Sequence, residues 1–515
     1  MIRFGAATAA YQIEGAVREG GRGPSIWDDF CALPGRVVGG ESGEVACDHY
    51  HRWRSDLDLM AALGLETYRF SIAWPRVQPE GRGRLNRRGV AFYRRLIEGC
   101  LERGIEPVAT LDHWDLPSAR QAVGGWASRD TIERFAEYAG LMGEQLGDVV
   151  TDWITHNEPW VVAFLGHAEG VKAPGIRDWV TALRVAHHLL VSHGMVAEAL
   201  RAAGAPGTRV GITLNLAPVH PASGSEADRA AAMRMDGHLN RWFLDPVFRG
   251  RYPEDMVALY SRRYGLLDVV EEGDRSLMSV PIDFLGVNYY MPKRVRAALG
   301  TGPLGLESVK VGGDLTAMGW EVDADGLHSL LLRLRRDYGK VPIYITENGA
   351  AYDDAEVVNG TVDDPERTAY LRDHLAAVQR AVANGVDVRR YYPWSLLDNF
   401  EWEHGYAKRF GIVRVDYETQ RRIPKRSGLS YATTSRGQVG AYRPTVAERL
   451  GWRVMDDRPG ARRDVGDGGS AHRHLEASPR PPDTCFSGCP SRCTAAAGAT
   501  AGAPSARACR RCASS

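Results

Sequence analysis

The sequence has no excess of charge of either sign, no long apolar run, and few cysteines before Cys485. Basic and acidic residues number 64 each, and this balance argues against a broad surface for nucleic acid or anionic lipid. No apolar stretch reaches the length of a membrane span, and the N-terminus lacks the layout of a secretion signal. We therefore expect a cytoplasmic protein with no nucleic-acid or membrane partner; the oligomeric state stays open.

The cysteines follow no metal-ligand pattern. Cys31, Cys47 and Cys100 are scattered, which predicts reduced thiols packed as small hydrophobic side chains. The other five fall between Cys485 and Cys512, where a lone Cys-x-x-Cys pair is a weak signal without zinc spacing. The sequence therefore implies no metal and no cofactor.

Strand-like segments alternate with longer amphipathic segments through most of the chain. The predicted strands are Phe4–Gln12, Glu66–Trp74, Pro107–Trp114, Val150–Glu158, Val210–Leu216, Ile282–Tyr290, Pro342–Glu347 and Val388–Leu397. The predicted helices include Arg88–Arg103, Thr131–Leu146 with Ser128 as N-cap, Trp179–Ala203, Asp325–Tyr338 and Pro365–Asn384. Eight such units predict an α/β fold, a (β/α)₈ barrel, over residues 1–429.

Two of the predicted strands end in a glutamate. Ile154–Glu158 is followed by proline, and Ile343–Glu347 by Asn-Gly, so each apolar run stops abruptly at a carboxylate. The C-terminal strand ends of a barrel meet at one face, where active sites lie. Two carboxylates there are suited to displacement at a sugar carbon. The alternative is that each glutamate pairs with an arginine at the rim.

The other predicted strand ends are also polar or aromatic, which a purely structural barrel face would not need. They are Gln12, Arg69, His113, Trp114, Asn157, Asn288, Tyr290 and Trp394. The loop Asp398–Tyr406 adds aromatic and acidic side chains, which suits sugar binding, although a packed aromatic lid is the alternative. For His113 alone, the alternative is a hydrogen-bonded core histidine.

Several motifs together resemble family 1 glycoside hydrolases, the β-glucosidases. They are Ala6–Gly15, Tyr68–Arg76, His113–Pro117, Thr155–Pro159, Ile345–Gly349 and Trp394–Trp402, in the family's order. The resemblance runs from about residue 4 to about residue 429, which is most of the chain.

This resemblance implies roles for individual residues. Glu347 would be the nucleophile and Glu158 the general acid and then base, with carboxyls about 5–5.5 Å apart for a retaining mechanism. Arg69 and Tyr290 would stabilise ionised Glu347, and Asn288 would support the site. Trp394 would form a stacking floor for the sugar, and Trp320 a leaving-group platform for which simple packing is the alternative. The remaining residues would bind hydroxyls of the sugar: Gln12, His113, Asn157, Glu401 and Trp402.

The Glu401-Trp402 pair separates this chain from the phosphoglycosidase branch, which the resemblance gives a serine and a lysine there. The implied substrates are small unphosphorylated β-D-glucosides, including cello-oligosaccharides, with β-galactosides and β-fucosides as further candidates. The natural aglycone, and the balance between hydrolysis and transglycosylation, stay open. Cellulose and polysaccharide degradation are the implied context.

The family resemblance stops where a last helix should close the barrel. From Ser430 the helical periodicity is lost, and residues 430–515 become rich in Arg, Ala, Gly, Pro and Ser, which predicts a mostly disordered tail. A shifted reading frame near residue 430 would produce such a tail. The second hypothesis is therefore a weakly active or inactive sugar-binding barrel that has lost its C-terminal helix.

Overall fold

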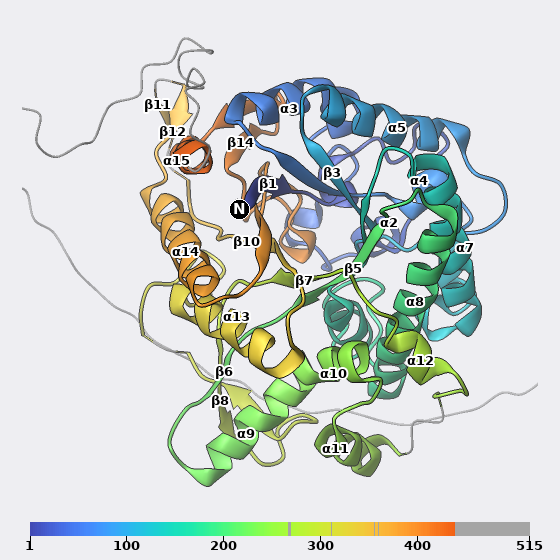
Figure 1. Cartoon of the computed structure of the whole chain (residues 1–515), viewed down its shortest axis with the longest axis vertical. Coiled ribbons are helices and arrows are strands. Elements are labelled where there is room, and N and C mark those ends of the chain that lie inside the picture. The colour runs from blue at the N-terminus through green and yellow to red at the C-terminus, as the bar shows by residue number, and fades with distance from the viewer. Residues whose placement is uncertain (266–268, 311, 355, 359, 438–515) are drawn as a thin grey trace, which may run out of the picture. The chain divides into compact units, whose positions relative to one another are not determined.

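The computed structural model describes residues 1–265, 269–310, 312–354, 356–358 and 360–437, and its centre is a closed barrel of eight parallel strands (Figure 1). Around the barrel the strands follow the order β1-β13-β10-β7-β5-β4-β3-β2. Their bounds are β1 (Arg3–Ala7), β2 (Thr67–Ser71), β3 (Glu106–Asp112), β4 (Asp152–Asn157), β5 (Arg209–Asn215), β7 (Phe284–Asn288), β10 (Ile343–Asn348) and β13 (Val388–Pro393). This is the (β/α)₈ TIM barrel that the alternating pattern predicts.

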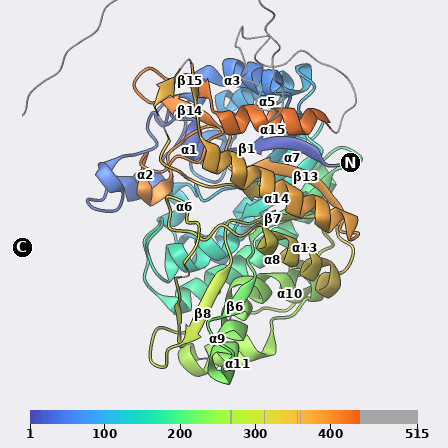
Figure 2. The same cartoon turned by 90° about the vertical axis from the view of Figure 1, so that its left-hand side faces the viewer.

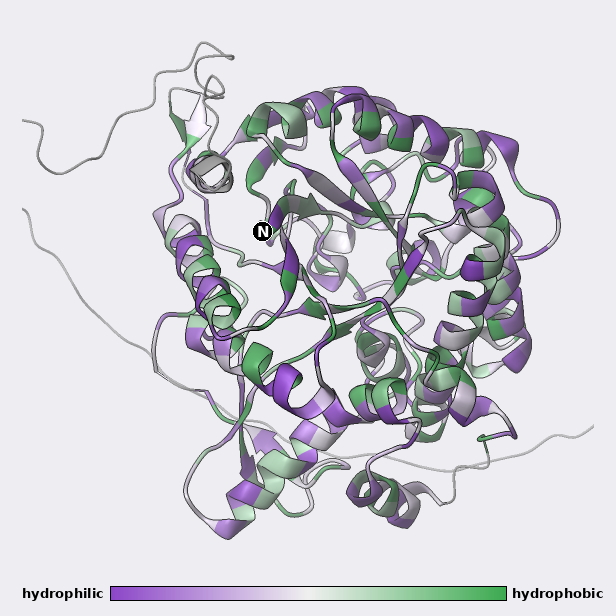
Figure 3. Ribbon diagram, in the orientation of Figure 1, coloured by the Kyte–Doolittle hydropathy of each residue, from purple (hydrophilic) through white to green (hydrophobic). Residues whose placement is uncertain are grey.

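Helices cover the outside of the barrel, as the two cartoon views show (Figure 2). The main ones are α3 (His49–Leu63), α5 (Arg87–Glu102), α7 (Arg129–Leu146), α8 (Trp179–Ala203), α10 (Trp242–Arg249), α13 (Ala324–Tyr338), α14 (Pro365–Ala383) and α15 (Arg426–Gly437). Hydrophilic and hydrophobic residues alternate along them (Figure 3). In α5, Tyr93, Leu96, Ile97 and Cys100 are buried at helical spacing, so one face packs inward.

All eight predicted strands are confirmed, but several end earlier than predicted. Gln12 lies in the short helix α1 (Ala10–Ile13) and Trp394 follows β13, because the chain turns where the barrel ends. The five predicted helices are also confirmed within two residues at each end. Ser128 is the N-cap of α7 as predicted, but its side chain makes no capping hydrogen bond. Cys47 and Cys100 are buried and Cys31 is half-buried, all as free thiols.

The structure also contains shorter strands, helices and turns that the sequence pattern does not predict. The extra strands are β6 (Val219–Pro221), β8 (Lys293–Ala297), β9 (Leu306–Ser308), β11 (Val357–Val358), β12 (Thr361–Val362), β14 (Val413–Asp416) and β15 (Arg421–Pro424). The extra helices are α2 (Ile26–Cys31), α4 (Trp74–Val77), α6 (Ser118–Gln121), α9 (Glu226–Asp236), α11 (Glu254–Tyr264) and α12 (Asp274–Met278). Short turns of 3₁₀ or π type are η1 (Val38–Gly40), η2 (Gly125–Ala127), η3 (Val161–Leu165), η4 (Gly237–Arg241) and η5 (Trp402–His404).

The last helix corrects one expectation from the sequence. Helical structure was predicted to be lost from Ser430, yet α15 continues to Gly437, eight residues beyond Leu429. The reason is packing: Tyr431 is buried, its hydroxyl donates to the carbonyl oxygens of Gly5 and Tyr391, and its ring contacts Phe4 at 5.8 Å. The premise of a weak barrel without a last helix is therefore wrong. The rest of the predicted tail, 438–515, lies outside the described residues.

Candidate active site

A cleft of about 610 Å³ opens at the C-terminal ends of the barrel strands, and both strand-end glutamates line it. Glu158 directly follows β4, and Glu347 is the next-to-last residue of β10. Both carboxyl groups are almost fully enclosed, with exposed fractions of 6% and 3%. Carboxylates are rarely buried so deeply without a reason, so their partners decide what each can do.

Glu347 accepts two strong hydrogen bonds, one at each oxygen. Arg69 Nη1 lies 2.6 Å from Oε1, and the Tyr290 hydroxyl lies 2.6 Å from Oε2. The Arg69 guanidinium is completely buried, so its attraction to the carboxylate is weakly screened. Two donors, one of them cationic, suit the ionised form of this carboxyl.

Glu158 has a different environment. Its Oε1 accepts a hydrogen bond from Asn288 Nδ2 at 2.7 Å, and no cation pairs with it among the described residues. Burial, and next the negative charge of Glu347, raise the pKa of Glu158 to about 8. Its backbone has φ 50°, an uncommon value for a non-glycine residue, and its N–H donates to the carbonyl of Thr213 on β5.

A chain of hydrogen bonds connects the two carboxyls through the barrel. Arg69 Nη2 donates to Asn157 Oδ1 at 2.6 Å, and Asn288 Nδ2 approaches the same oxygen at 3.1 Å. Because Arg69 also holds Glu347 and Asn288 also holds Glu158, Asn157 links both partners. Thr346 fixes the other end of Asn288 by donating to its Oδ1 at 2.7 Å. The geometry of the pair is therefore set by rigid strands rather than by loops.

Two buried polar atoms beside this network have no partner among the described residues. Burial, helped by the charge of Arg69, lowers the pKa of His113 well below its usual range, so the ring is neutral. Its Nε2 accepts from Asn157, which leaves the proton on Nδ1 without an acceptor. Gln12 donates from Nε2 to Asn399 and Phe400, while its Oε1 is unsatisfied. Such atoms cost about 1–3 kcal/mol each unless a ligand satisfies them.

Aromatic rings line the cleft around the carboxyls. The Trp394 ring stacks with His113 at 5.7 Å, and the Trp402 ring lies 4.6 Å from that of Trp114. Trp320, half-buried, contacts Tyr290 edge-on at 5.3 Å. Flat apolar faces next to unsatisfied polar atoms favour a ligand with both C–H surfaces and hydroxyl groups.

Glu401 is a third enclosed carboxyl, and it lies on the loop after β13 with Trp402. Burial raises its pKa to about 8, although the positive charge of Lys172 opposes the shift. Lys172 itself pairs with Glu403 at 2.5 Å and lies over the Trp114 ring. A protonated Glu401 donates as well as accepts hydrogen bonds, which suits a sugar hydroxyl.

The structure brings all the predicted site residues to one place, but in two layers. Those that line the cleft are His113, Glu158, Asn288, Tyr290, Trp320, Glu347, Trp394, Glu401 and Trp402. Gln12, Arg69 and Asn157 are fully buried and connect to it through hydrogen bonds.

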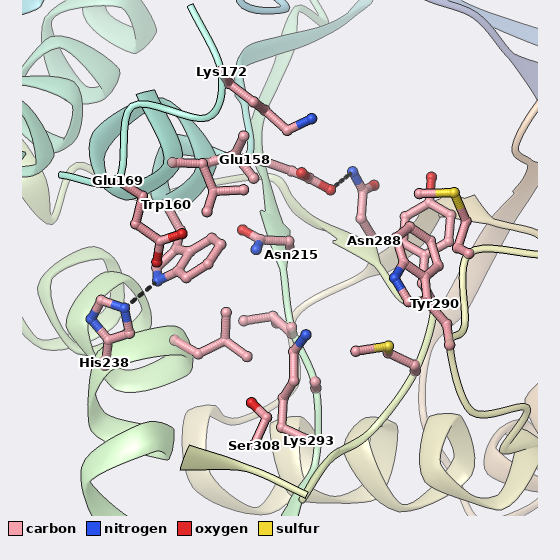
Figure 4. Close-up of a pocket in the computed structure, with 18 of the residues that line it drawn as sticks. Glu158, Trp160, Glu169, Lys172, Asn215, His238, Asn288, Tyr290, Lys293 and Ser308 are labelled. Carbon is pink, nitrogen blue, oxygen red and sulfur yellow. Dashed lines mark hydrogen bonds between the residues drawn. The ribbon is translucent and has the colours of Figure 1, made fainter. Parts of the chain in front are cut away.

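Sequence reasoning missed several lining residues (Figure 4): Trp160, Glu169, Lys172, Asn215, His238 and Lys293. Asn215 was detectable, because it is the next-to-last residue of the predicted strand Val210–Leu216, and it is the last residue of β5. Lys172 and Lys293 follow no periodic or motif signal, since their places depend on how the loops fold. In the described parts of the chain, no group of three or more potential ligands could hold a metal ion, and no helix is long and apolar enough to cross a membrane.

Comparisons with known proteins agree on one family. The model of "Glycosyl hydrolase family 1" matches residues 2–438. Beta-glucosidase A of Acetivibrio thermocellus is 47% identical over 432 residues, which cover 83% of this chain and 96% of that protein. Thermostable beta-glucosidase B of Thermobispora bispora is 50% identical, covering 83% and 88%. The Thermotoga maritima beta-glucosidase in complex with glucoimidazole superposes with a TM-score of 0.81 at 44% identity, covering 84% and 97%. The chain belongs to glycosyl hydrolase family 1.

Proposed function

We propose that the protein removes terminal non-reducing β-D-glucosyl residues from unphosphorylated β-glucosides, including cello-oligosaccharides, with retention of configuration. The observation that carries the proposal is the contrast between the two carboxyls. Glu347 accepts from a buried guanidinium and a tyrosine hydroxyl, whereas the pKa of Glu158 is raised to about 8. One group is thus equipped to attack as an anion and the other to donate a proton.

The reaction follows from this contrast in two steps. Glu347 attacks the anomeric carbon, and Glu158 protonates the departing glycosidic oxygen, so a glycosyl ester forms and the aglycone leaves. Esterification removes the negative charge that helps to raise the Glu158 pKa. Glu158, ionised since it gave its proton to the departing oxygen, therefore stays ionised more readily, and it accepts a proton from the water that hydrolyses the ester.

The remaining predicted residues have proposed roles in holding the sugar. His113 and Gln12 each have an unsatisfied atom for a hydroxyl, and they bond to Asn157 and Glu401 respectively. Trp394 and Trp402 would provide stacking faces, and Trp320 a surface for the leaving group. Arg69, Tyr290 and Asn288 would hold the two carboxyls. Proteins named beta-glucosidase at 47% and 50% identity support glucosides as substrates. A cytoplasmic location, β-galactosides and β-fucosides stay predictions from the sequence.

The test is the pair of variants Glu158→Gln and Glu347→Gln, assayed on cellobiose. Each should lower kcat by about 10³-fold or more, because each removes a group required in the transition state. An aryl glucoside whose leaving group needs no proton should restore the first step in Glu158→Gln but not in Glu347→Gln. Proton NMR of the wild-type reaction should show β-glucose as the first anomer released.

Glu102→Gln, on the exposed surface of α5, is the matched control and should keep wild-type rates. Normal turnover of cellobiose by either site variant would refute the assignment, and so would release of the α-anomer first.

A further inference from the structure

One lysine in the cleft has no role in the reaction described above. Lys293, the first residue of β8, lines the same cleft as Glu158. In Figure 4 its amino group points toward Asn215 and the side of the cleft that holds Glu158. The two carboxyl groups whose charges act on it are Glu158 and Glu169. Because Glu158 protonates the departing oxygen, Lys293 lies on the leaving-group side.

The Lys293 ammonium makes no hydrogen bond or ion pair with the described residues. Lys172, by contrast, pairs with Glu403 and lies over the Trp114 ring. Burial lowers the pKa of Lys293 to about 8, so its charge is present near neutral pH but poorly solvated. Glu169 attracts it only from beyond salt-bridge distance, and Glu158 is neutral when it acts as the acid. A partly desolvated cation that forms no ion pair favours an anionic ligand group.

Lys293 lies among both polar and apolar side chains in the cleft, with Asn215, His238 and Ser308 drawn around it in Figure 4. Trp160, whose ring nitrogen bonds to His238 at 3.1 Å, provides an aromatic wall. Further apolar lining comes from Leu165, Met235, Leu239 and Leu306. The flat face of the Trp160 indole is suited to contact with an aromatic aglycone.

We propose that Lys293 selects aryl β-glucosides whose aglycone carries a carboxylate, by pairing with that carboxylate in the leaving-group half of the cleft. The proposal rests on the proposed function, because it needs a glucosidase to act on. It adds the class of aglycone, which the two catalytic carboxyls leave undefined.

The experiment compares para-carboxyphenyl with para-carbamoylphenyl β-D-glucoside, which have nearly the same shape but differ in charge. For wild type and Lys293→Met, kcat/KM is measured on both below pH 8, and the carboxy-to-carbamoyl ratio is formed for each enzyme. Intrinsic leaving-group reactivity cancels between enzymes. Lys293→Met should lower the ratio about tenfold or more, the effect of losing a charge-assisted bond, with little change on the carbamoyl substrate.

Two further variants should not lower the carboxy-to-carbamoyl ratio as Lys293→Met does. Lys293→Arg keeps the cation and should keep the preference for the carboxylate. Glu169→Gln removes a nearby negative charge and should raise the ratio. An unchanged ratio in Lys293→Met, or an equal loss on both substrates in a variant with wild-type melting temperature, overturns the inference.

A measurement on the wild type alone covers the case in which Lys293→Met does not fold. Para-hydroxybenzoate should inhibit at a concentration about tenfold lower than para-hydroxybenzamide, for the same electrostatic reason. Equal inhibition overturns the inference while leaving the proposed function intact. If the wild type hydrolyses neither these glucosides nor cellobiose, the proposed function fails as well.

Discussion

At the scale of single residues, identical carboxyl groups acquire different chemistry from the atoms that touch them. Glu347 receives a cation and a hydroxyl, whereas the pKa of Glu158 is raised first by burial and then by the charge of Glu347, against the effect of one amide. A shift of one pKa unit corresponds to about 1.4 kcal/mol between protonation states, so a few contacts are enough to separate the two roles. The roles therefore depend on Arg69 and Tyr290 as much as on the glutamates.

The raised pKa of Glu158 predicts the alkaline side of the pH profile. The protonated form, which donates the proton, is present below the pKa of about 8 and is lost as pH rises through it. We expect kcat/KM for an unactivated glucoside to fall on the alkaline side with an apparent pKa near 8. A pH series of kcat/KM checks this.

The Glu347→Gln variant tests the cause of that shift. Without the Glu347 charge, the pKa of Glu158 should fall, yet stay above its usual value because burial is unchanged. Carbon NMR of labelled glutamate during a pH titration measures it directly. An unchanged Glu158 pKa in this variant would show that burial alone is responsible.

Much of the site was predictable from the sequence, because its residues lie where apolar strands end. Arg69, Asn157, Glu158, Asn288 and Glu347 all belong to strands or directly follow them, and strands are recognisable from their apolar runs. Lys172 and Lys293 could not be predicted in this way. Lys172 lies in the loop after η3 and Lys293 begins β8, and both elements contribute residues to the lining of the cleft, which depends on tertiary packing.

At the scale of elements, a buried ionic cluster ties the loop after β13 to the C-terminal part of the chain. Lys425, directly after β15, pairs with Asp354 at 2.5 Å and with Asp398 at 2.7 Å. All three side chains are completely enclosed. Asp398 also accepts from Arg409, and Arg367 of α14 pairs with Asp354. Asp398 stands three residues before Glu401, so the cluster anchors the loop that carries this part of the site.

We expect Lys425→Met to destabilise the fold by about 3–5 kcal/mol, because it leaves the Asp354 and Asp398 carboxylates without their shared cation. Chemical denaturation measures the loss. In protein that stays folded, KM for a glucoside should rise more than kcat falls, because the Glu401 loop loses an anchor while Glu158 and Glu347 stay on their strands.

Arg380→Met is the matched control, since it breaks an exposed pair with Asp325 on the surface. Its cost should stay below about 1 kcal/mol. Equal destabilisation by the two variants would contradict the role of the cluster.

The elements that were not predicted share a physical feature. The hairpin of β14 and β15 and the sheet of β6, β8 and β9 consist of short strands, and the pairing of β6 with β8 also joins segments far apart in sequence. Val219 pairs with Lys293, for example, across more than seventy positions. These short strands lack the buried apolar runs that mark the barrel strands, so they do not stand out in the sequence.

At the scale of the whole molecule, barrel closure depends on β1, which joins β2 on one side and β13 on the other. Helix α15 contacts this closing strand through Tyr431, whose hydroxyl donates to the carbonyls of Gly5 on β1 and Tyr391 on β13. One side chain therefore joins the first and last strands of the barrel. All eight barrel strands and the helices described around them lie within residues 1–437.

This arrangement predicts opposite effects of two truncations. A chain that ends at Gly437 keeps the whole of α15, so its melting temperature and kcat/KM should match the full-length protein. A chain that ends at Leu429 loses Tyr431 and Ala432 and leaves apolar surface of Phe4 uncovered. It should melt at a lower temperature and aggregate. Thermal unfolding and turnover of an aryl glucoside measure both effects.

Point variants assign the effect to packing rather than to chain length. Tyr431→Ala in the full-length chain should cost about 3–5 kcal/mol, because it removes a buried ring and two hydrogen bonds. Thr433→Ala on the exposed side of the same helix should cost less than about 0.5 kcal/mol. If Tyr431→Ala is as stable as Thr433→Ala, then α15 does not hold the barrel closed. If the chain ending at Gly437 is inactive while the full-length protein is active, the catalytic unit does not end with α15.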